Sequence, residues 1–249
     1  MRHASRLLLD LGNTRLKWAL HRDGGWRANG AVAWDDDVAG TLADAWSSQP
    51  RPEAVFGASV VDAPREVLVA ACVADAFGRE PRWLRTPAEA CGVRNAYAEP
   101  QKLGVDRFLA MVAARADGPA PCVLAGVGTA LTLDALAADG RHLGGLIAPG
   151  PRLMQQSLLG ATAQVRPAHA GAIVEAADNT ADAVASGCWL AAAALVERFA
   201  ARMAPALGGA PALRLGGGDA EALLPLLTVP ARLVHDSVLH GLAAWAAAQ

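Results

Sequence analysis

The residues best suited to chemistry stand close to the start of the chain. A short apolar run, Arg6–Leu9, predicts a buried strand that ends at Asp10, and Gly12–Thr14 follow as a turn without a bulky side chain. Glycine lets backbone N–H groups approach an anion, a threonine hydroxyl can donate to a phosphate oxygen, and Lys17 can neutralise charge. A carboxylate such as Asp10 binds Mg²⁺, usually through water. The stretch predicts a phosphate–metal site, although a tight hairpin with a surface Asp also fits the pattern.

A second group of reactive residue types, Gly104–Arg107, opens a predicted helix after a polar, irregular loop. Asp106 can accept a proton from a substrate hydroxyl, and Arg107 can bind a carboxylate through two parallel hydrogen bonds. Tyr97, the only tyrosine, precedes this group in the loop and could cover a small polar ligand. The alternatives are ordinary helix-start residues with a solvated arginine, and an aromatic ring packed on the surface.

Three further stretches combine glycine with hydroxyl or amide side chains. Gly128-Thr129 is a second Gly-Thr turn, and Asn179-Thr180 precede a long apolar helix. Asn and Thr are good helix N-caps, but the Thr180 hydroxyl could also contact a substrate. Gly216–Gly218 follow a strand, so a base or ribose could lie on bare backbone there, unless the glycines only form a flexible connection. Residues Gly144–Gly150 predict a strand that ends in a Pro-Gly turn, and we expect it to have a structural role in shaping the cleft.

The elements that must position these residues follow from apolar periodicity and from turn residues. Alternation predicts a second strand around Leu16–Leu20, and an Asp-Gly turn leads into a third. The remaining expected elements of the first half are strands at Trp26–Trp34, Ala54–Val60 and Pro81–Leu84 and helices at Asp37–Ser47, Pro64–Phe77 and Leu103–Ala116. The second half predicts a helix over Ala181–Met203 and a last helix over Ser237–Ala248.

An internal repeat begins at Cys122. Shifting the first hairpin by 116 residues places Asp10 on Gly126, Gly12 on Gly128 and the Asp23-Gly24 turn on Asp139-Gly140. On this alignment the strand that begins at Val55 corresponds to Leu213–Leu215. Two meanders that share glycines by accident would be the alternative.

A repeated unit of three strands, then helix and strand, is typical of an α/β fold of the ribonuclease-H type. Two copies predict two duplicated domains, mixed sheets flanked by helices, with a nucleotide cleft between them. This arrangement resembles the acetate and sugar kinase, heat-shock ATPase and actin superfamily. Gly118–Pro121 interrupts both helix and strand, so we expect domains at residues 1–118 and 119–249, with the last helix able to pack on either.

Composition narrows the class of protein. The 249 residues are 53% hydrophobic with a mean hydropathy of +0.24, but no run reaches about eighteen uninterrupted apolar residues. Too few apolar residues follow the basic start for a signal peptide. A net charge of −2 without a basic block argues against nucleic acid, and four scattered cysteines indicate reduced thiols. We therefore expect a cytoplasmic protein without a membrane or nucleic-acid partner.

Taken together in order, these motifs resemble the type III pantothenate kinases over nearly the whole chain. The resemblance is carried by seven elements, namely DLGNTRLK (10–17), Tyr97, GVDR (104–107), GVGTALTLD (126–134), GGLIAPG (144–150), NTADAVASG (179–187) and the glycines at 216–218. It implies ATP-dependent phosphorylation of pantothenate to 4′-phosphopantothenate, the first step of coenzyme A biosynthesis, by a Mg²⁺-dependent homodimer.

The resemblance also implies residue roles. Asp106 is the catalytic proton acceptor, and Asp10 is a metal ligand through water. The residues implied to bind ATP are Asp10, Leu11, Gly12, Asn13, Thr14, Arg15, Leu16, Lys17 and Thr129. Those implied to bind pantothenate are Tyr97, Gly104, Val105, Asp106, Arg107 and Thr180, the last from the partner subunit.

One position departs from the family pattern. Many members carry Asp two residues before the glycine of the second Gly-Thr turn, where it binds K⁺ or ammonium, whereas this chain has Gly126. Either other oxygens hold the cation or this chain needs it less. Two other functions stay open: another small-molecule kinase of the superfamily, or a non-catalytic, nucleotide-binding accessory regulator of transcription.

Overall fold

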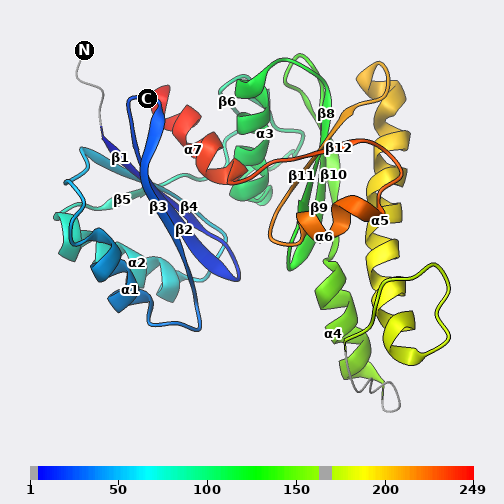
Figure 1. Ribbon diagram of the computed structural model, residues 1–249. Helices are drawn as coiled ribbons and strands as arrows, with labels where there is room; N and C mark the ends of the chain where they lie inside the picture. Colours follow the sequence, from blue (N-terminus) through cyan, green and yellow to red (C-terminus); the bar gives the residue numbers. More distant parts are fainter. Residues whose placement is uncertain (1–4, 163–169) are drawn as a thin grey trace. The chain divides into compact units, whose positions relative to one another are not determined.

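A computed structural model describes residues 5–162 and 170–249, which form two compact units of α/β structure (Figure 1). Unit 1 comprises Met1–Gly118 together with Ser237–Gln249, and unit 2 comprises Pro119–Asp236. Each unit contains one five-stranded mixed sheet, and each is a ribonuclease-H-like domain.

The sheet of unit 1 has the strand order β3-β2-β1-β4-β5. The first three strands pair antiparallel, and β4 and β5 add in parallel. The bounds are β1 (Arg6–Leu11), β2 (Arg15–Arg22), β3 (Gly25–Ala33), β4 (Ala54–Ser59) and β5 (Pro81–Trp83). A small β6 (Glu89–Ala90) and β7 (Val93–Arg94) hairpin and the short helix η1 (Pro100–Lys102) lie in the expected loop.

Both faces of this sheet are buried, which explains the uninterrupted leucines of β1. Leu7 and Leu9 belong to a core cluster with α1 and α2, whereas Leu8 belongs to a second cluster with α3 and α7. Successive strand residues point to opposite faces, so a fully apolar run requires a cover on each side. The helices are α1 (Val38–Trp46), α2 (Ala63–Phe77), α3 (Val105–Asp117) and α7 (Ser237–Ala247).

Side-chain caps fix two of the helix starts in unit 1. Asp37 accepts a hydrogen bond from Gly40 N at 3.0 Å, and Asp62 accepts one from Arg65 N at 3.1 Å. Each satisfies a backbone donor that the first helical turn leaves unpaired. The end of α2 is Gly78, whose φ of 59° suits glycine at a helix C-terminus.

The sheet of unit 2 has the equivalent order β10-β9-β8-β11-β12. Its strands are β8 (Cys122–Val127), β9 (Ala130–Leu136), β10 (His142–Pro149), β11 (Ala212–Gly216) and β12 (Ala231–Leu233). Its helices are α4 (Pro151–Ala161), α5 (Thr180–Leu207), α6 (Ala220–Leu223) and η2 (Leu224–Leu226). Trp189, Val196 and Phe199 of α5 pack with Leu131 and Leu133 of β9 in the core of this unit.

The pairing registers support the internal repeat. Leu7 pairs with Val55 in unit 1, and Val123, its counterpart at a shift of 116, pairs with Leu213 in unit 2. The turn after the first strand differs, however. Asp10 lies opposite Lys17, but Gly126 lies opposite Thr132, so the unit 2 turn is one residue shorter and the shift along the second strand is 115. Thr129 therefore corresponds to Thr14.

The last helix departs from the expected domain range of 119–249. Leu239, Leu242 and Ala246 of α7 share a buried cluster with Leu8 and Leu109, and α7 contacts α3 and β1. The helix therefore belongs to unit 1, which closes the second face of the first sheet (Figure 1). The apolar face of α7 alone does not specify which sheet it covers, so the sequence left both possibilities open.

One described helix, α5, is long and apolar enough to cross a membrane, by length and composition only. The expectation concerned an uninterrupted apolar run, and α5 is not one, because Asp182, Glu197 and Arg198 interrupt it. Half of its most apolar window is buried in the protein, and Ala192, Ala193 and Val196 are core residues. The central helix of a folded domain passes the same test, so this is weak evidence for a membrane span.

Candidate active site

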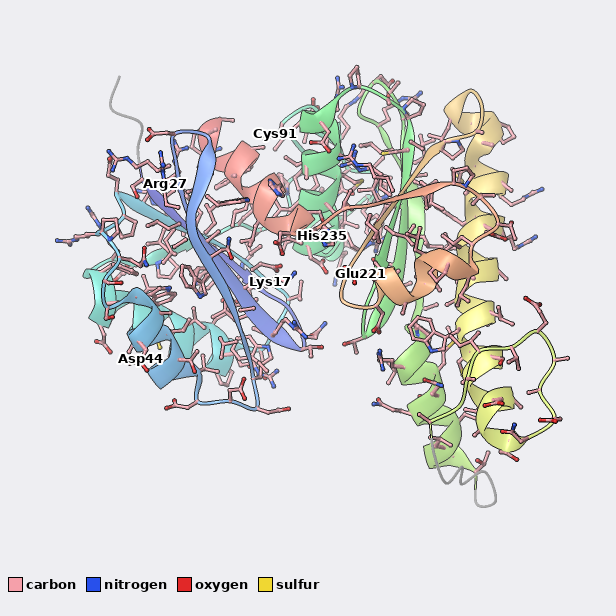
Figure 2. All side chains as sticks on the ribbon, in the orientation of Figure 1. Lys17, Arg27, Asp44, Cys91, Glu221 and His235 are labelled. Atoms are coloured by element: carbon pink, nitrogen blue, oxygen red, sulfur yellow. The ribbon has the colours of Figure 1, made fainter. Side chains whose placement is uncertain are left out.

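The predicted phosphate turn is the connection between β1 and β2. Asp10 lies opposite Lys17 in the antiparallel ladder, so a carboxylate and an ammonium group stand side by side on neighbouring strands. Figure 2 marks Lys17 on this sheet. Gly12 N donates to Arg15 O at 3.1 Å and closes the turn, whose residues Asn13 and Thr14 are exposed. Asp10, Gly12–Thr14 and Lys17 are thus brought together, as the sequence predicts.

Neighbouring strands hold this turn in place. Trp34, directly after β3, donates from Nε1 to Gly12 O at 2.7 Å and from its backbone N–H to Thr14 O at 3.4 Å. Val60 N donates to Leu11 O at 3.1 Å from the end of β4. Both contacts fix the turn from outside, and Trp34 is a contributor that the sequence analysis did not single out. Its only sequence signal is its place at the end of an alternating strand.

The Gly104–Arg107 group begins α3. Asp106 Oδ1 accepts a hydrogen bond from Arg107 N at 2.9 Å, so the carboxylate folds back over the helix start. A Cβ placed on Gly104 would lie 2.5 Å from that oxygen, which is closer than real Cβ contacts allow. A larger residue at position 104 would therefore make the Asp106 carboxylate shift from its place at the N-terminus of α3.

Tyr97 and Arg107 are in direct contact. Arg107 Nη1 donates to Tyr97 Oη at 3.2 Å, and the guanidinium carbon lies 5.9 Å from the tyrosine ring centroid. Arg107 is only 6% exposed, so its charge is held in a defined position. A nearly buried guanidinium with a phenol beside it suits recognition of a small carboxylate. The structure thus brings together two residues that are ten apart in the chain.

The two groups of unit 1 lie on a common framework. Ala58 of β4 pairs in parallel with Asp10, and Ala58 shares a buried cluster with Val105, the neighbour of Asp106. Thr86 Oγ1 donates to Leu103 O at 2.7 Å and ties down the approach to α3. The start of α3 is therefore anchored to the strand ends at which Asp10 and the Gly12–Thr14 turn stand, so unit 1 contains all three of Asp106, Lys17 and this turn.

In unit 2 the second Gly-Thr turn joins β8 and β9. Gly128 N donates to Ala130 O at 3.1 Å, and Gly150 N donates to Thr129 O at 2.8 Å. Thr129 is exposed, as is Thr14 in unit 1. A glycine N–H closes the turn in both units, on Arg15 O in unit 1 and on Ala130 O in unit 2, so the repeat keeps the Gly-Thr turn but not its length.

The position of the absent carboxylate, Gly126, is filled by a neighbour. A Cβ on Gly126 would lie 2.6 Å from Thr132 Oγ1, so the threonine hydroxyl occupies the place where a larger side chain would begin. The next carboxylate along β9, Asp134, is buried and bonds to His142 Nε2 at 2.9 Å. The residues present do not offer a carboxylate at position 126 for a monovalent cation.

Two segments border the unit 2 turn more closely than expected. Gly217 has φ of 98°, and a Cβ there would lie 2.2 Å from Val127 O. Asp219 N donates to the same carbonyl at 3.0 Å, and the Asp219 carboxylate accepts a 2.7 Å hydrogen bond from Arg152 Nε. The glycines at 216–218 thus form a close backbone approach, and the Arg152–Asp219 pair beside it was not predicted.

Thr180 is the first residue of α5 and is exposed. The N-cap is Asn179, whose side chain accepts from Asp182 N at 3.0 Å, so the capping role belongs to the asparagine. The Thr180 hydroxyl is not needed for the cap. Nothing in unit 2 by itself relates Thr180 to the Tyr97–Arg107 pair of unit 1.

Within residues 5–162 and 170–249, no group of three or more His, Cys, Asp or Glu side chains could hold a metal ion. A single carboxylate, such as Asp10 at the phosphate turn, is the donor set expected where Mg²⁺ arrives with a nucleotide and keeps most of its waters. The residues present therefore fit a nucleotide-borne magnesium ion.

Comparison with known proteins agrees with these features. The family model described as type III pantothenate kinase matches residues 6–202. A type III pantothenate kinase of Aromatoleum aromaticum is 43% identical over 237 residues, covering 95% of this chain and 96% of the relative. One of Stenotrophomonas maltophilia is 45% identical over 246 residues, covering 97% of each chain.

Among solved structures, a putative 2-dehydro-3-deoxygalactonokinase of Sinorhizobium meliloti superposes with a TM-score of 0.60 at 17% identity. The match covers 98% of this chain and 96% of that one, and it shows that the two share the duplicated α/β fold. The family model spans both Gly-Thr turns and the Tyr97–Arg107 pair, so the chain belongs to the type III pantothenate kinases.

Proposed function

We propose that this chain transfers the γ-phosphoryl group of ATP to the terminal hydroxyl of pantothenate and so forms 4′-phosphopantothenate, the first step of coenzyme A biosynthesis. Family membership supplies the reaction, and the observation that carries it in this chain is the group at the start of α3. There Asp106 stands next to a nearly buried Arg107 that is held by Tyr97. A proton acceptor beside a carboxylate-binding arginine suits an acceptor molecule that has both a hydroxyl and a carboxylate.

The residue roles follow from this placement. Arg107, with Tyr97, Gly104 and Val105, holds pantothenate, and Asp106 accepts the proton of the attacking hydroxyl. Residues 10–17 of unit 1, including Asp10 and Lys17, bind the ATP phosphates, and Thr129 of unit 2 contributes its hydroxyl. Thr180 contacts pantothenate from the partner subunit of a homodimer in the cytoplasm.

The proposed reaction needs no covalent bond between the protein and the transferred phosphoryl group. Phosphoryl transfer passes through a loose transition state, so positioning and charge neutralisation dominate. Lys17 and the N–H groups of the Gly12–Thr14 turn neutralise phosphate charge, and Asp106 takes its proton as the new bond forms. Bound Mg²⁺ would add neutralisation between the phosphate oxygens, with Asp10 as its carboxylate on the protein. No step is assigned to a monovalent cation, because Gly126 supplies no carboxylate for it.

A coupled assay of ADP release tests the proposal. Turnover should require pantothenate together with Mg-ATP and should not occur with a panel of sugars and sugar acids. Because we assign no step to a monovalent cation, replacing KCl by choline chloride should leave kcat unchanged. ATP binding without turnover on pantothenate would instead favour a non-catalytic regulator, and turnover with another acceptor would favour a different kinase.

A further inference from the structure

Arg152 and Asp219 form an ion pair that the proposed mechanism does not use. We propose that Arg152 is a phosphate-binding residue of unit 2 and that Asp219 is its positioning residue. The inference deepens the proposed function and rests on it, because it takes the ligand of the unit 2 turn to be a nucleoside triphosphate. It adds a cation to unit 2, where Thr129 was the only phosphate contact that the sequence analysis assigned.

The pair is built around the Gly128–Thr129 turn. Arg152 is two residues after Gly150, whose N–H donates to Thr129 O at 2.8 Å. Asp219 N donates to Val127 O at 3.0 Å. Both partners are therefore fixed by the backbone to the residues on either side of Gly128, and the pair spans the turn.

The segments that carry the pair are packed so tightly that their positions are well defined. A Cβ on Gly150 would lie 1.8 Å from Gly128 O, and one on Gly217 would lie 2.2 Å from Val127 O. Both distances are far below any contact that a real Cβ makes. The start of α4 and the loop before α6 are thus pressed against the turn, and the Arg152 side chain starts from a rigid base.

The contacts of Arg152 occupy only part of its guanidinium group. Nε donates to Asp219 Oδ1 at 2.7 Å, and the guanidinium carbon lies 5.8 Å from the Trp189 ring centroid. Among the described residues, neither terminal amino group has a hydrogen-bonding partner. The arginine side chain is 66% exposed, whereas that of Asp219 is 13% exposed. Asp219 and Trp189 therefore orient the fork while its outer donors face solvent, which suits a bidentate contact with phosphate.

Charge supports a phosphate rather than an uncharged ligand. In unit 1 the ladder position opposite Asp10 supplies Lys17, but in unit 2 the corresponding pair is Gly126 and Thr132, and neither side chain ionises. Arg152 is the cation that unit 2 places beside its turn. A triphosphate in the transition state gains from positive charge on more than one side.

The test uses the intact protein and a matched pair elsewhere in unit 2. Arg141 also donates from Nε to an aspartate, Asp139, at 2.7 Å, but it stands between β9 and β10, away from the Gly-Thr turn in sequence. Binding of the ATP analogue AMPPNP and of adenosine would be measured by calorimetry for wild type, Arg152→Ala, Arg152→Lys, Asp219→Asn and Arg141→Ala.

We expect Arg152→Ala to weaken AMPPNP binding by about tenfold or more, the scale of hydrogen bonds to charged groups, without changing adenosine affinity. Arg152→Lys should recover part of the loss. Asp219→Asn should raise KM for ATP but not for pantothenate, and Arg141→Ala should match wild type. Since exposed ion pairs contribute little to stability, melting temperatures should stay close to that of wild type.

Equal AMPPNP affinity in Arg152→Ala and Arg141→Ala would overturn the inference, and so would a parallel loss of adenosine binding, which would make the pair purely structural. If Arg152→Ala fails to fold, Arg152→Lys and Asp219→Asn decide in the same way. Wild-type protein that binds AMPPNP through Arg152 but does not turn over pantothenate would refute the proposed function and leave this inference standing.

Discussion

The two units share one topology but distribute their charges differently. At the first ladder position of the phosphate turn, unit 1 carries Asp10 opposite Lys17, whereas unit 2 carries Gly126 opposite Thr132. In each turn the glycine N–H donates a 3.1 Å hydrogen bond, to Arg15 O in unit 1 and to Ala130 O in unit 2, whose turn is one residue shorter. Duplication has thus kept a glycine-closed turn in both units, but only unit 1 has ionisable side chains at this ladder position.

The interiors of the two sheets also differ in polarity, but here unit 2 has the ionisable residues. Unit 2 buries a polar pair, Asp134 and His142, whereas unit 1 has Ala19 and Trp26 at the corresponding positions. Trp26 packs edge-on against His21 instead. A buried, fully bonded pair fixes one arrangement of the β9–β10 hairpin at a cost in desolvation. Unit 2 therefore has ionisable side chains within its sheet but none at the first ladder position of its turn, whereas unit 1 has them at that position of its turn.

If the chemistry belongs to unit 1, the largest effect should come from its proton acceptor. Asp106→Asn should lower kcat by at least about a hundredfold, the low end of a general-base contribution. The matched variant is Asp182→Asn, at the first turn of α5 in unit 2, which should retain most of the activity because it keeps the acceptor for Ala172 N. Steady-state kinetics with pantothenate measures both, and near-wild-type turnover by Asp106→Asn would remove the assigned base.

The charge difference at the two turns gives the next prediction. Lys17→Met should lower kcat/KM for ATP by about tenfold to a hundredfold, since a contact between charged groups is lost. Thr132→Val, at the corresponding position of unit 2, should change it by no more than about twofold, as for a substitution that alters no special interaction. Similar losses of kcat/KM in the two variants would contradict the proposal that the side chains at the unit 1 turn contribute more to ATP binding than those at the unit 2 turn.

Recognition of the acceptor should show a smaller and more selective effect. Arg107→Lys replaces a planar fork, held by Tyr97, with a point charge. We expect KM for pantothenate to rise by about tenfold and KM for ATP to change little. Initial-rate measurements with each substrate varied in turn test this, with Arg141→Ala as the control for loss of an arginine pair. Equal increases in the two KM values would argue against a carboxylate contact.

Local patterns in the sequence were enough to predict most of each unit but not its long-range pairs. Val55 and Leu213 occupy equivalent registers, as the repeat predicts, because periodic apolar residues and turn glycines act locally. Helix α4 was missed, since Pro149-Gly150-Pro151 indicates a turn although proline also suits the first helical position. The shorter Gly-Thr turn of unit 2 could not be recognised from the sequence alignment, because the shift returns to 116 at the Asp139-Gly140 turn.

In the candidate site, too, residues close in sequence were predicted and contacts between distant residues were not. The family resemblance assigned Tyr97 and Arg107 to one substrate site, and in the structure the two side chains are hydrogen-bonded. Arg152 and Asp219 are 67 residues apart and meet only because β8, α4 and the loop before α6 converge on one turn. A contact of that kind depends on tertiary packing, which no local spacing encodes. The approach of Asp10 and Asp106 to Thr129 across the two units stays a prediction.

The smallest effect concerns pH and lies in unit 2. Burial raises the pKa of the Cys122 thiol to about 11, at the start of β8, where the corresponding residue of unit 1 is Arg6. Because the folded-state pKa is above the unfolded value, this thiol stabilises the fold below about pH 9, and that contribution is lost as pH rises toward 11. Between pH 8 and pH 10 the loss amounts to about 1 kcal/mol.

Denaturant unfolding of wild type and Cys122→Ala at several pH values isolates this contribution. The variant starts less stable at pH 8, because a buried side chain is shortened, but its disadvantage should shrink as pH rises, since it has no thiol to ionise. Other groups that titrate in this range cancel in the difference between the two proteins. A difference that stays constant from pH 8 to pH 10 would mean that the thiol is not buried as the structure has it, and the contrast between Cys122 and the charged Arg6 would lose its meaning for stability.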